Sequence, residues 1–171
     1  MSRRGHGLRV CALLLLLSAL PARASDRHVV VDKPRLRLYV IARTDTLLNV
    51  PVCVGRNFGD KQRKGDLRTP EGTFSVSQIQ NSKAWEHDFH DGAGMRKGAY
   101  GPWFIRLKTP RWSSIGIHGT CFPHTIGTRD SEGCIRLHNR DVEALKELVE
   151  PGMEVIVLPD EPALYTCGQS L

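Results

Sequence analysis

The sequence predicts a mostly β domain, a sandwich or partial barrel, with one helix packed on one side. Short runs of alternating or β-branched apolar residues recur along the chain, and turn-forming segments rich in Gly, Pro, Asn and Asp separate them. Only one segment, near residue 140, has the apolar spacing of an amphipathic helix. About 147 residues remain after an N-terminal export-type segment, which is enough for one domain with its own core.

Two strand segments are predicted in the first part of the chain, in residues 28–42 and 44–55. Apolar residues alternate through residues 28–42 among β-branched neighbours, which indicates one strand or a bent pair of strands. Residues 44–55 read as another strand that ends at Gly55, and the two segments together predict a hairpin. Because Pro51 cannot donate a backbone hydrogen bond, it predicts a sheet edge or a bulge at that point.

A long segment without periodicity follows the next predicted strand. Residues 56–72 are charged and rich in turn formers, so they predict a loop, and residues 73–79 alternate as a strand does. Residues 81–100 show neither the period of a strand nor that of a helix, and connections of that length are commonly functional. We expect this segment to be a mobile flap over a groove, with its glycines as hinges.

The second half of the chain predicts two short strands, the helix and a final strand. Residues 102–108 and 113–119 read as the short strands. In residues 140–152 the apolar residues fall on one helical face, Asn139 is a good N-cap, and a Pro-Gly pair ends the helix. Residues 153–159 then form the last predicted strand.

The first 24 residues have the pattern of a secretory signal peptide. Three arginines precede an apolar run of about 11 residues, and small residues follow at the positions that a signal peptidase reads. Such a run is too short to cross a bilayer, which needs roughly 20 apolar residues. We therefore expect an exported protein of the periplasm or cell envelope, with one domain at 25–160 and a loose tail at 161–171.

The net charge argues against a protein that binds nucleic acid. The chain has 24 Lys and Arg against 18 Asp and Glu, which gives a formal charge of +6. Four of the arginines and none of the acids lie in the first 24 residues, so the remainder carries 20 basic against 18 acidic residues, or +2. A charge so close to zero is not the signature of a nucleic-acid-binding domain.

Four cysteines follow the predicted signal peptide: Cys53, Cys121, Cys134 and Cys167. Export makes disulfides possible. If one cysteine stays reduced for catalysis, the other three make one bridge and leave one spare thiol. With Cys134 as the reduced residue, the pairing among Cys53, Cys121 and Cys167 is open.

Cys134 lies in a setting that could activate a thiol. The chain reads TRDSEGCIRLHNRD over residues 128–141, so Cys134 follows Gly133 and comes just before the helix start. A thiol becomes a strong nucleophile as the thiolate, which a nearby imidazolium, backbone N–H groups or the positive end of a helix favours. His118, at the end of a predicted strand, could be the base, and Arg136 could hold a substrate carboxylate.

An ordered set of short motifs runs through residues 28–158. The stretch IHGTCFPHTIGTRDSEGCIRLHNRDVEAL contains a His-Gly pair and, further on, Ser-Glu-Gly-Cys followed by an apolar residue and Arg. Other stretches are VDKPRLRLYV, VPVCVG, RTPEGTF, GAYGPWFIRL and EPGMEVIV. In this order they resemble the L,D-transpeptidase catalytic domain, also called the YkuD domain, which implies a mostly β fold with one helix after the catalytic cysteine.

The resemblance implies a reaction and a role for each site residue. In this family a cysteine attacks the carbonyl between the third and fourth residues of a peptidoglycan stem peptide, without a metal or organic cofactor. The acyl group then passes to an amine of a neighbouring stem, to a wall-attached protein or to water. Carried onto this chain, the nucleophile is Cys134 and the base is His118. The implied oxyanion and substrate-binding residues are Ser131, Gly133, Arg136 and Gly119.

One position departs from the family pattern. This chain has Glu132 where the family usually has a second histidine. A carboxylate there would favour a protonated His118 but oppose an anionic thiolate and oxyanion. The sequence also leaves the acceptor open, because cross-linking, protein attachment, trimming as an L,D-carboxypeptidase and release of an attachment share the first acylation.

Other interpretations of the same residues stay open at this point. Cys121-x2-His124 and Cys134-x3-His138 imitate the spacing of zinc ligands. A secreted β-sandwich that binds a ligand without catalysis would hold Cys134 in a disulfide. His124 could also replace His118 as the base.

The predicted flap contains side chains of functional types. His87, Asp88 and His90 could bind a metal, although a solvated lid is the simpler interpretation. Trp85 is the best candidate for a lid residue. Tyr100 is interpreted as packing at the edge of the core.

Overall fold

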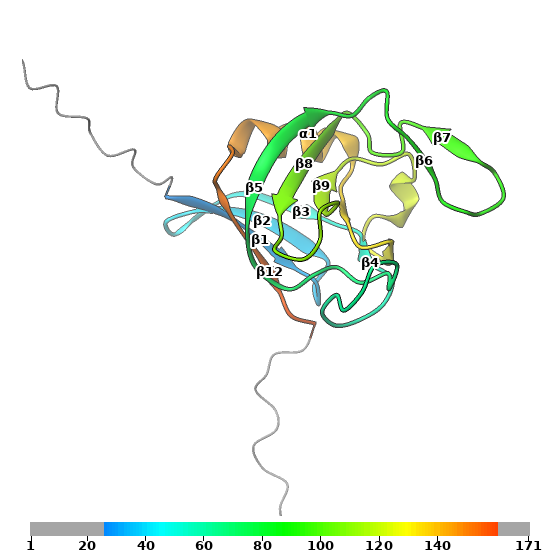
Figure 1. The fold of residues 1–171 in the computed structure, drawn as a ribbon. Coiled ribbons are helices and arrows are strands. Elements are labelled where there is room, and N and C mark those ends of the chain that lie inside the picture. The colour runs from blue at the N-terminus through cyan, green and yellow to red at the C-terminus, as the bar shows by residue number, and fades with distance from the viewer. Residues whose placement is uncertain (1–25, 161–171) are drawn as a thin grey trace, which may run out of the picture.

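The computed structural model of the protein describes residues 26–160, which form a curled main sheet with one α-helix against it (Figure 1). The predicted signal peptide and C-terminal tail lie outside the described residues. The sheet curls partway into a barrel, so the prediction of a mostly β fold, a partial barrel with one helix, is confirmed. Within residues 26–160, no helix has the length and apolar character needed to cross a membrane.

The main sheet has eight strands. In order across the sheet they are β11 (Ile135–Arg136), β9 (Gly116–His118), β8 (Trp103–Lys108), β5 (Gly72–Asn81), β12 (Glu154–Leu158), β1 (Arg27–Asp32), β2 (Arg37–Ala42) and β3 (Asp45–Pro51). Neighbours are antiparallel except in two parallel pairs, β1 with β12 and β9 with β11. The β9–β11 pair sets His118 opposite Arg136, and this places the strand that ends in His118 beside the chain that follows Cys134.

Two small strand pairs and two helices complete the described fold. They are β4 (Val54–Gly55) with β10 (Arg129–Ser131), β6 (Glu86–Asp88) with β7 (Met95–Lys97), the 3-10 helix η1 (Pro123–Thr125) and the α-helix α1 (Asn139–Leu148). The core between the sheet and α1 consists almost entirely of Val, Ile and Leu side chains. Branched residues of this kind fit the pleated face of a sheet, which is why the alternating runs of the sequence become its strands.

The first three strands follow the sequence prediction, except that the strand predicted for residues 44–55 is divided: β3 ends at Pro51, and Val54–Gly55 form β4 in a separate sheet with β10. Residues 28–42 form β1 and β2, an antiparallel pair with a turn between them, and β2 forms the predicted hairpin with β3. β3 is an edge strand of the main sheet and ends at Pro51. A proline at the end of an edge strand removes no interior ladder hydrogen bond, so the edge predicted from this residue is confirmed.

The segment 81–100 is not the structureless connection that its lack of period predicts. It contains the short hairpin β6–β7, which Figure 1 shows projecting from the body of the domain. Its cross-strand pairs are Glu86 with Lys97, His87 with Arg96 and Asp88 with Met95. Because five of these six residues are polar, the hairpin lacks the apolar alternation of a half-buried strand, and periodicity could not reveal it.

The helix α1 lies where the sequence predicts it, but its start is capped differently. His138 is the N-cap residue, and Asn139 is the first helical residue. The Asn139 side-chain oxygen instead accepts a 2.8 Å hydrogen bond from the backbone N–H of Thr120, which ties the start of α1 to the chain that follows β9. The predicted apolar face is confirmed, since Val142 and Leu145 are fully buried in the core.

Candidate active site

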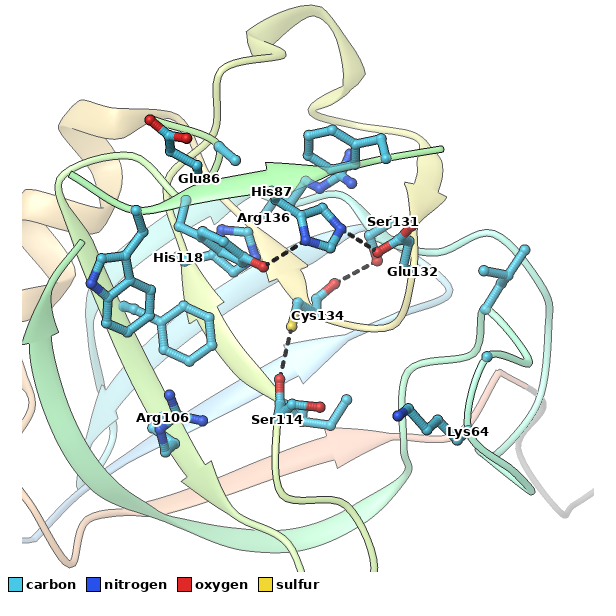
Figure 2. Close-up of a pocket in the computed structure, with 18 of the residues that line it drawn as sticks. Lys64, Glu86, His87, Arg106, Ser114, His118, Ser131, Glu132, Cys134 and Arg136 are labelled. Carbon is cyan, nitrogen blue, oxygen red and sulfur yellow. Dashed lines mark hydrogen bonds and ion pairs between the residues drawn. The ribbon is translucent and has the colours of Figure 1, made fainter. Parts of the chain in front are cut away.

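A cavity of about 910 Å³ opens where residues of β8, β9 and β11 meet (Figure 2). The side chains of Cys134, His118, Ser131 and Arg136 line it, so the structure brings four of the six predicted site residues into one cavity. The two predicted glycines adjoin these residues through their backbone. The β6–β7 hairpin and the loop at 56–72 supply further parts of the wall.

Cys134 sits in the tight turn between β10 and β11, with a half-buried side chain. Its thiol donates a hydrogen bond to the carbonyl oxygen of Ser114, 3.4 Å from the sulfur. Burial raises the pKa of the Cys134 thiol above its ordinary value, although the Gly116 backbone N–H and the charge of Arg136 act in the opposite direction. The expectation that the surroundings lower this pKa is wrong for the unliganded site, where the thiol is protonated at neutral pH.

The turn that carries Cys134 is held together by Ser131 and Gly133. The Ser131 hydroxyl donates to the Cys134 carbonyl oxygen at 2.6 Å and accepts a 3.1 Å hydrogen bond from the Gly133 backbone N–H. Gly133 has a φ of 133°, and a Cβ there would lie 2.7 Å from the carbonyl oxygen of Arg68. Glycine is therefore required at this position, and its N–H is already engaged by Ser131.

His118 is buried at the end of β9 and is oriented by its neighbour Gly119. Its Nδ1 atom lies 2.5 Å from the Gly119 carbonyl oxygen, so Nδ1 carries the proton and Nε2 carries the free lone pair. The imidazole stacks on the Phe104 ring, with centroids 5.3 Å apart, and meets the Tyr100 ring edge-on at 4.9 Å. A Cβ on Gly119 would lie 2.3 Å from Oδ1 of Asn139. Glycine is therefore needed at this position, directly after His118.

The environment of His118 keeps its imidazole neutral. Burial lowers the pKa of His118 from 6.5 to about 3; the Arg136 and His87 charges also lower it, while the bond to Gly119 opposes them. A neutral imidazole and a protonated thiol therefore line the same cavity. His118 is therefore available as a proton acceptor across the neutral and mildly acidic range.

This buried imidazole predicts a loss of stability in mild acid. Between pH 6.5 and the folded pKa of about 3, the unfolded chain binds a proton at His118 that the folded chain does not. Unfolding is therefore favoured as pH falls, by about 1.4 kcal/mol per pH unit for this group. We expect His118→Gln to remove this part of the slope when denaturant unfolding is measured at pH 6.5 and at about pH 5.5, where Asp and Glu side chains with ordinary pKa values of about 4 stay largely ionised. Equal slopes for the variant and the parent would contradict the prediction.

Arg136 is buried beside the cavity and is fixed through its backbone. Its N–H and carbonyl groups form two hydrogen bonds with Cys53, of 2.8 and 2.9 Å. Its guanidinium group lies 3.7 Å from a carboxylate oxygen of Asp130, which is a long ion pair, and 5.3 Å from the centre of the Phe89 ring. A buried guanidinium with so loose a partner is suited to binding an anionic group in the cavity.

Charged side chains lie on two sides of Cys134 (Figure 2). Arg106 and Lys64 lie on the side toward which the sulfur points, whereas Glu86, Glu132 and the cationic Arg136 lie on the other side. Arg106 is held in place by a 3.1 Å bond from its Nε to Gln80 and packs over the Phe104 ring.

His87 and Tyr100 belong to the site although the sequence analysis did not place them there. The His87 Nε2 atom lies 2.8 Å from Oε2 of Glu132, and its Nδ1 atom lies 3.1 Å from the Tyr100 hydroxyl. His87 was interpreted as part of a solvated lid and Tyr100 as core packing. The sequence held one indication of this contact, an unusual acid at Glu132 and a histidine in the predicted flap. Only the fold shows that these two residues, 45 positions apart, are in contact.

The structure also bears on the alternative site residues. His124 is exposed on η1 and does not line the cavity that holds Cys134. Trp85 does line it and packs against Tyr100 and Phe104, with ring centroids 5.8 and 5.5 Å apart.

The cysteines and the candidate metal ligands do not pair in the described part of the chain. Cys53, Cys121 and Cys134 are free thiols, and Cys167 lies outside residues 26–160. Over that range no three His, Cys, Asp or Glu side chains come together as a metal site would require.

Sequence comparisons point to one family. The family model of the L,D-transpeptidase catalytic domain matches residues 26–157. YkuD of Bacillus licheniformis, named as an L,D-transpeptidase, is 32% identical over 124 residues, which are 72% of this chain and 59% of the relative. YkuD of Bacillus subtilis is 27% identical over 130 residues, or 76% of this chain and 65% of the relative. The chain thus spans less than two thirds of the length of these two relatives.

Solved structures have the same fold. An L,D-transpeptidase from Mycobacterium smegmatis superposes with a TM-score of 0.58 at 21% identity, covering 77% of this chain and 58% of that one. L,D-transpeptidase 3 from Mycobacterium tuberculosis, in complex with a faropenem-derived adduct, gives 0.59 at 17% identity, covering 78% and 60%. The LD transpeptidase LdtMt1 in complex with imipenem gives 0.58 at 17% identity, covering 78% and 59%. At these identities the similarity concerns the fold alone.

Proposed function

The chain belongs to the family of L,D-transpeptidase catalytic domains, and from this premise we propose that it is an exported cysteine acyltransferase that acts on peptidoglycan stem peptides. The observation that carries the proposal is the shared cavity of Cys134 and His118, in which the Gly119 carbonyl fixes the imidazole with Nε2 unprotonated. A thiol and an uncharged base in one cavity are the parts that acyl transfer needs. The cell envelope is the proposed location, because the substrate lies there.

In the first step, His118 accepts the thiol proton at Nε2 while the sulfur of Cys134 attacks the carbonyl carbon between the third and fourth stem residues. The C–S bond forms and the carbonyl oxygen becomes an oxyanion. His118 then gives its proton to the departing amine, the C–N bond breaks, and the fourth residue leaves. The product is a thioester on Cys134.

In the second step, the amine of a neighbouring stem attacks the thioester, and His118 accepts a proton from that amine. The C–S bond breaks as the new amide bond forms, and the proton returns to the sulfur. Water in place of the amine would give a free carboxylate, which is L,D-carboxypeptidase activity. Both outcomes restore the starting site.

Cys134 and His118 are both uncharged before substrate binds. This favours transfer of the thiol proton during the attack over a thiolate formed beforehand. The pKa of Cys134 is raised by burial and the pKa of His118 is lowered to about 3, so neither group is ionised before substrate binds. The positive charge of Arg136 favours the anionic sulfur and oxyanion that form during attack. We assign to Arg136 the binding of a stem carboxylate, because its guanidinium lines the cavity with only a long ion pair.

The oxyanion site is proposed on the turn of Cys134. The Gly133 N–H is bonded to Ser131, so this pair stabilises the turn. We therefore assign the contact with the oxyanion to the backbone N–H of Cys134 itself, with Ser131 and Gly133 as the residues that hold it in place. Gly119 acts on the base and not on the oxyanion.

Mass spectrometry of tetrapeptide muropeptides after incubation with the purified protein tests the function. A cross-linked dimer that has lost one fourth residue supports transpeptidation, and a tripeptide monomer supports hydrolysis by the same acyl-enzyme. Unchanged tetrapeptide after prolonged incubation would count against both.

Imipenem provides a direct probe of the proposed nucleophile. It presents a strained carbonyl beside a carboxylate, so we expect the Cys134 sulfur to open the ring and remain acylated, with the carboxylate near Arg136. Intact-mass measurement should show one added drug mass, and digestion should locate it on the Cys134 peptide. The same incubation of Cys134→Ala should show no adduct; an equal adduct on that variant would mean that another residue reacts.

A further inference from the structure

His87 connects the β6–β7 hairpin with the turn of the nucleophile. Its Nε2 atom lies 2.8 Å from Oε2 of Glu132, and its Nδ1 atom lies 3.1 Å from the hydroxyl of Tyr100. Glu132 is two residues before Cys134, and the Tyr100 ring packs edge-on against the His118 ring at 4.9 Å. An unbroken chain of contacts therefore runs from the nucleophile's turn, through the hairpin, to the base (Figure 2).

Aromatic contacts hold the same hairpin against the site. The Phe89 ring lies edge-on to His87 at 4.6 Å and to Phe122 at 5.0 Å. The guanidinium of Arg136 is 5.3 Å from the Phe89 ring, and that of Arg96 is 5.1 Å from the Phe122 ring. Such contacts tolerate some sliding, whereas the bond between His87 and Glu132 is directional and charge-assisted. This bond therefore fixes the position of the hairpin most closely.

The carboxylate of Glu132 affects the thiol directly. Its negative charge raises the pKa of Cys134, in the same direction as burial. A hydrogen-bond donor on that carboxylate opposes the effect, and His87 is placed to be this donor. The other charged or titratable groups that line the cavity are Lys61, Lys64, Glu86, His90, Tyr100, Arg106, His118 and Arg136.

We propose that His87 is a positioning residue, which latches the β6–β7 hairpin over Cys134 by binding the Glu132 carboxylate. The closed latch restricts access to the sulfur and partly neutralises the nearest acid. An open latch exposes the sulfur and leaves that acid without its donor. This role of His87 rests on the proposed function and deepens it. Its test measures only the reactivity of the Cys134 thiol, so the role of His87 and the proposed function can fail independently.

The test is alkylation of the full chain by iodoacetamide across a range of pH. The Cys134 thiolate displaces iodide, so a C–S bond forms as the C–I bond breaks, and the rate follows the thiolate fraction. Quantifying the Cys134 peptide after digestion separates it from the other cysteines. The midpoint of the pH profile reports the acidity of the thiol, and the plateau at high pH reports access to the sulfur.

We expect His87→Ala to raise the plateau by about three-fold and to raise the midpoint by roughly half a pH unit. Glu132→Ala should raise the plateau by a similar factor but lower the midpoint, because it removes the charge itself. The double variant should have the plateau of either single variant. His87→Gln should retain most of the parent behaviour, since its amide can still donate to Glu132.

Met95→Ala is the matched control, because Met95 lies on the same hairpin, is 59% exposed, carries no charge and does not line the cavity. Both the midpoint and the plateau should match the parent. The proposal is overturned if His87→Ala leaves the midpoint unchanged, or if the plateau increases of the two single variants multiply in the double variant. If His87 and Glu132 only supported the fold, His87→Ala and Glu132→Ala would not be expected to shift the midpoint in opposite directions.

Discussion

Cys134→Ala is expected to abolish turnover of tetrapeptide stems, with a loss of at least about 10⁴-fold. The sulfur forms the covalent bond of the proposed acyl-enzyme, and no other cysteine in residues 26–160 lines the cavity. The side chain is half-buried and donates only one hydrogen bond, to the Ser114 carbonyl, so its loss should cost little stability. The measurement is product formation by mass spectrometry, together with thermal unfolding of the variant.

Cys121→Ala is the control for this experiment. Cys121 is also a half-buried free thiol between β9 and β11, but it does not line the cavity. Its replacement should leave turnover at the parent level. If instead Cys134→Ala turns over tetrapeptide at nearly the parent rate, the assignment of the nucleophile is wrong.

His118→Gln is expected to slow acylation by about 10²- to 10⁴-fold, the usual contribution of a general base. The glutamine side chain fills much of the space of the imidazole but cannot take up the thiol proton. Single-turnover acylation by imipenem, followed by intact mass, measures this step alone. The exposed His124 offers a matched control, since His124→Gln removes an imidazole that does not line the cavity.

The parent protein should also show a distinctive pH dependence in this assay. Because the pKa of His118 is lowered to about 3, the base stays unprotonated throughout mild acid. The acylation rate should therefore show no fall centred on pH 6.5, the ordinary value for a histidine. A fall at that pH in the parent, or a His118→Gln rate within a few-fold of the parent rate, would reassign the base.

The sequence predicts most of the sheet because its strands are half-buried or fully buried. The runs around Val29, Val40 and Ile156 are apolar or alternating, and each becomes a strand of the main sheet. Pro51 marks the edge for a reason that needs no tertiary information, the missing N–H. The turn before Cys134 was predictable because Gly133 and the helix start are local signals, whereas the role of Cys134 as nucleophile is what the family resemblance implies.

The remaining features depend on contacts that no local pattern records. The β6–β7 hairpin pairs polar residues, so its strands carry no apolar period. The bond from Asn139 to Thr120 replaces a local cap with a distant partner. The pKa of Cys134 depends on how deeply the turn is buried, which the neighbouring residues in sequence do not reveal.

The place of β12 in the sheet has a consequence for how the protein acquires its structure. β12 is the last described strand along the chain, yet it lies between β5 and β1 and pairs with both. Until it is added, β1–β2–β3 and β5–β8–β9–β11 are two separate ladders. A chain that emerges N-terminus first from a ribosome or a translocation pore therefore cannot complete its sheet until its C-terminal part is free.

Non-local pairing of this kind slows folding, and it leaves the edges of the strands open to aggregation until β12 has paired. Truncation before residue 154 is accordingly expected to prevent assembly of the domain, even though every residue of the candidate site would still be present.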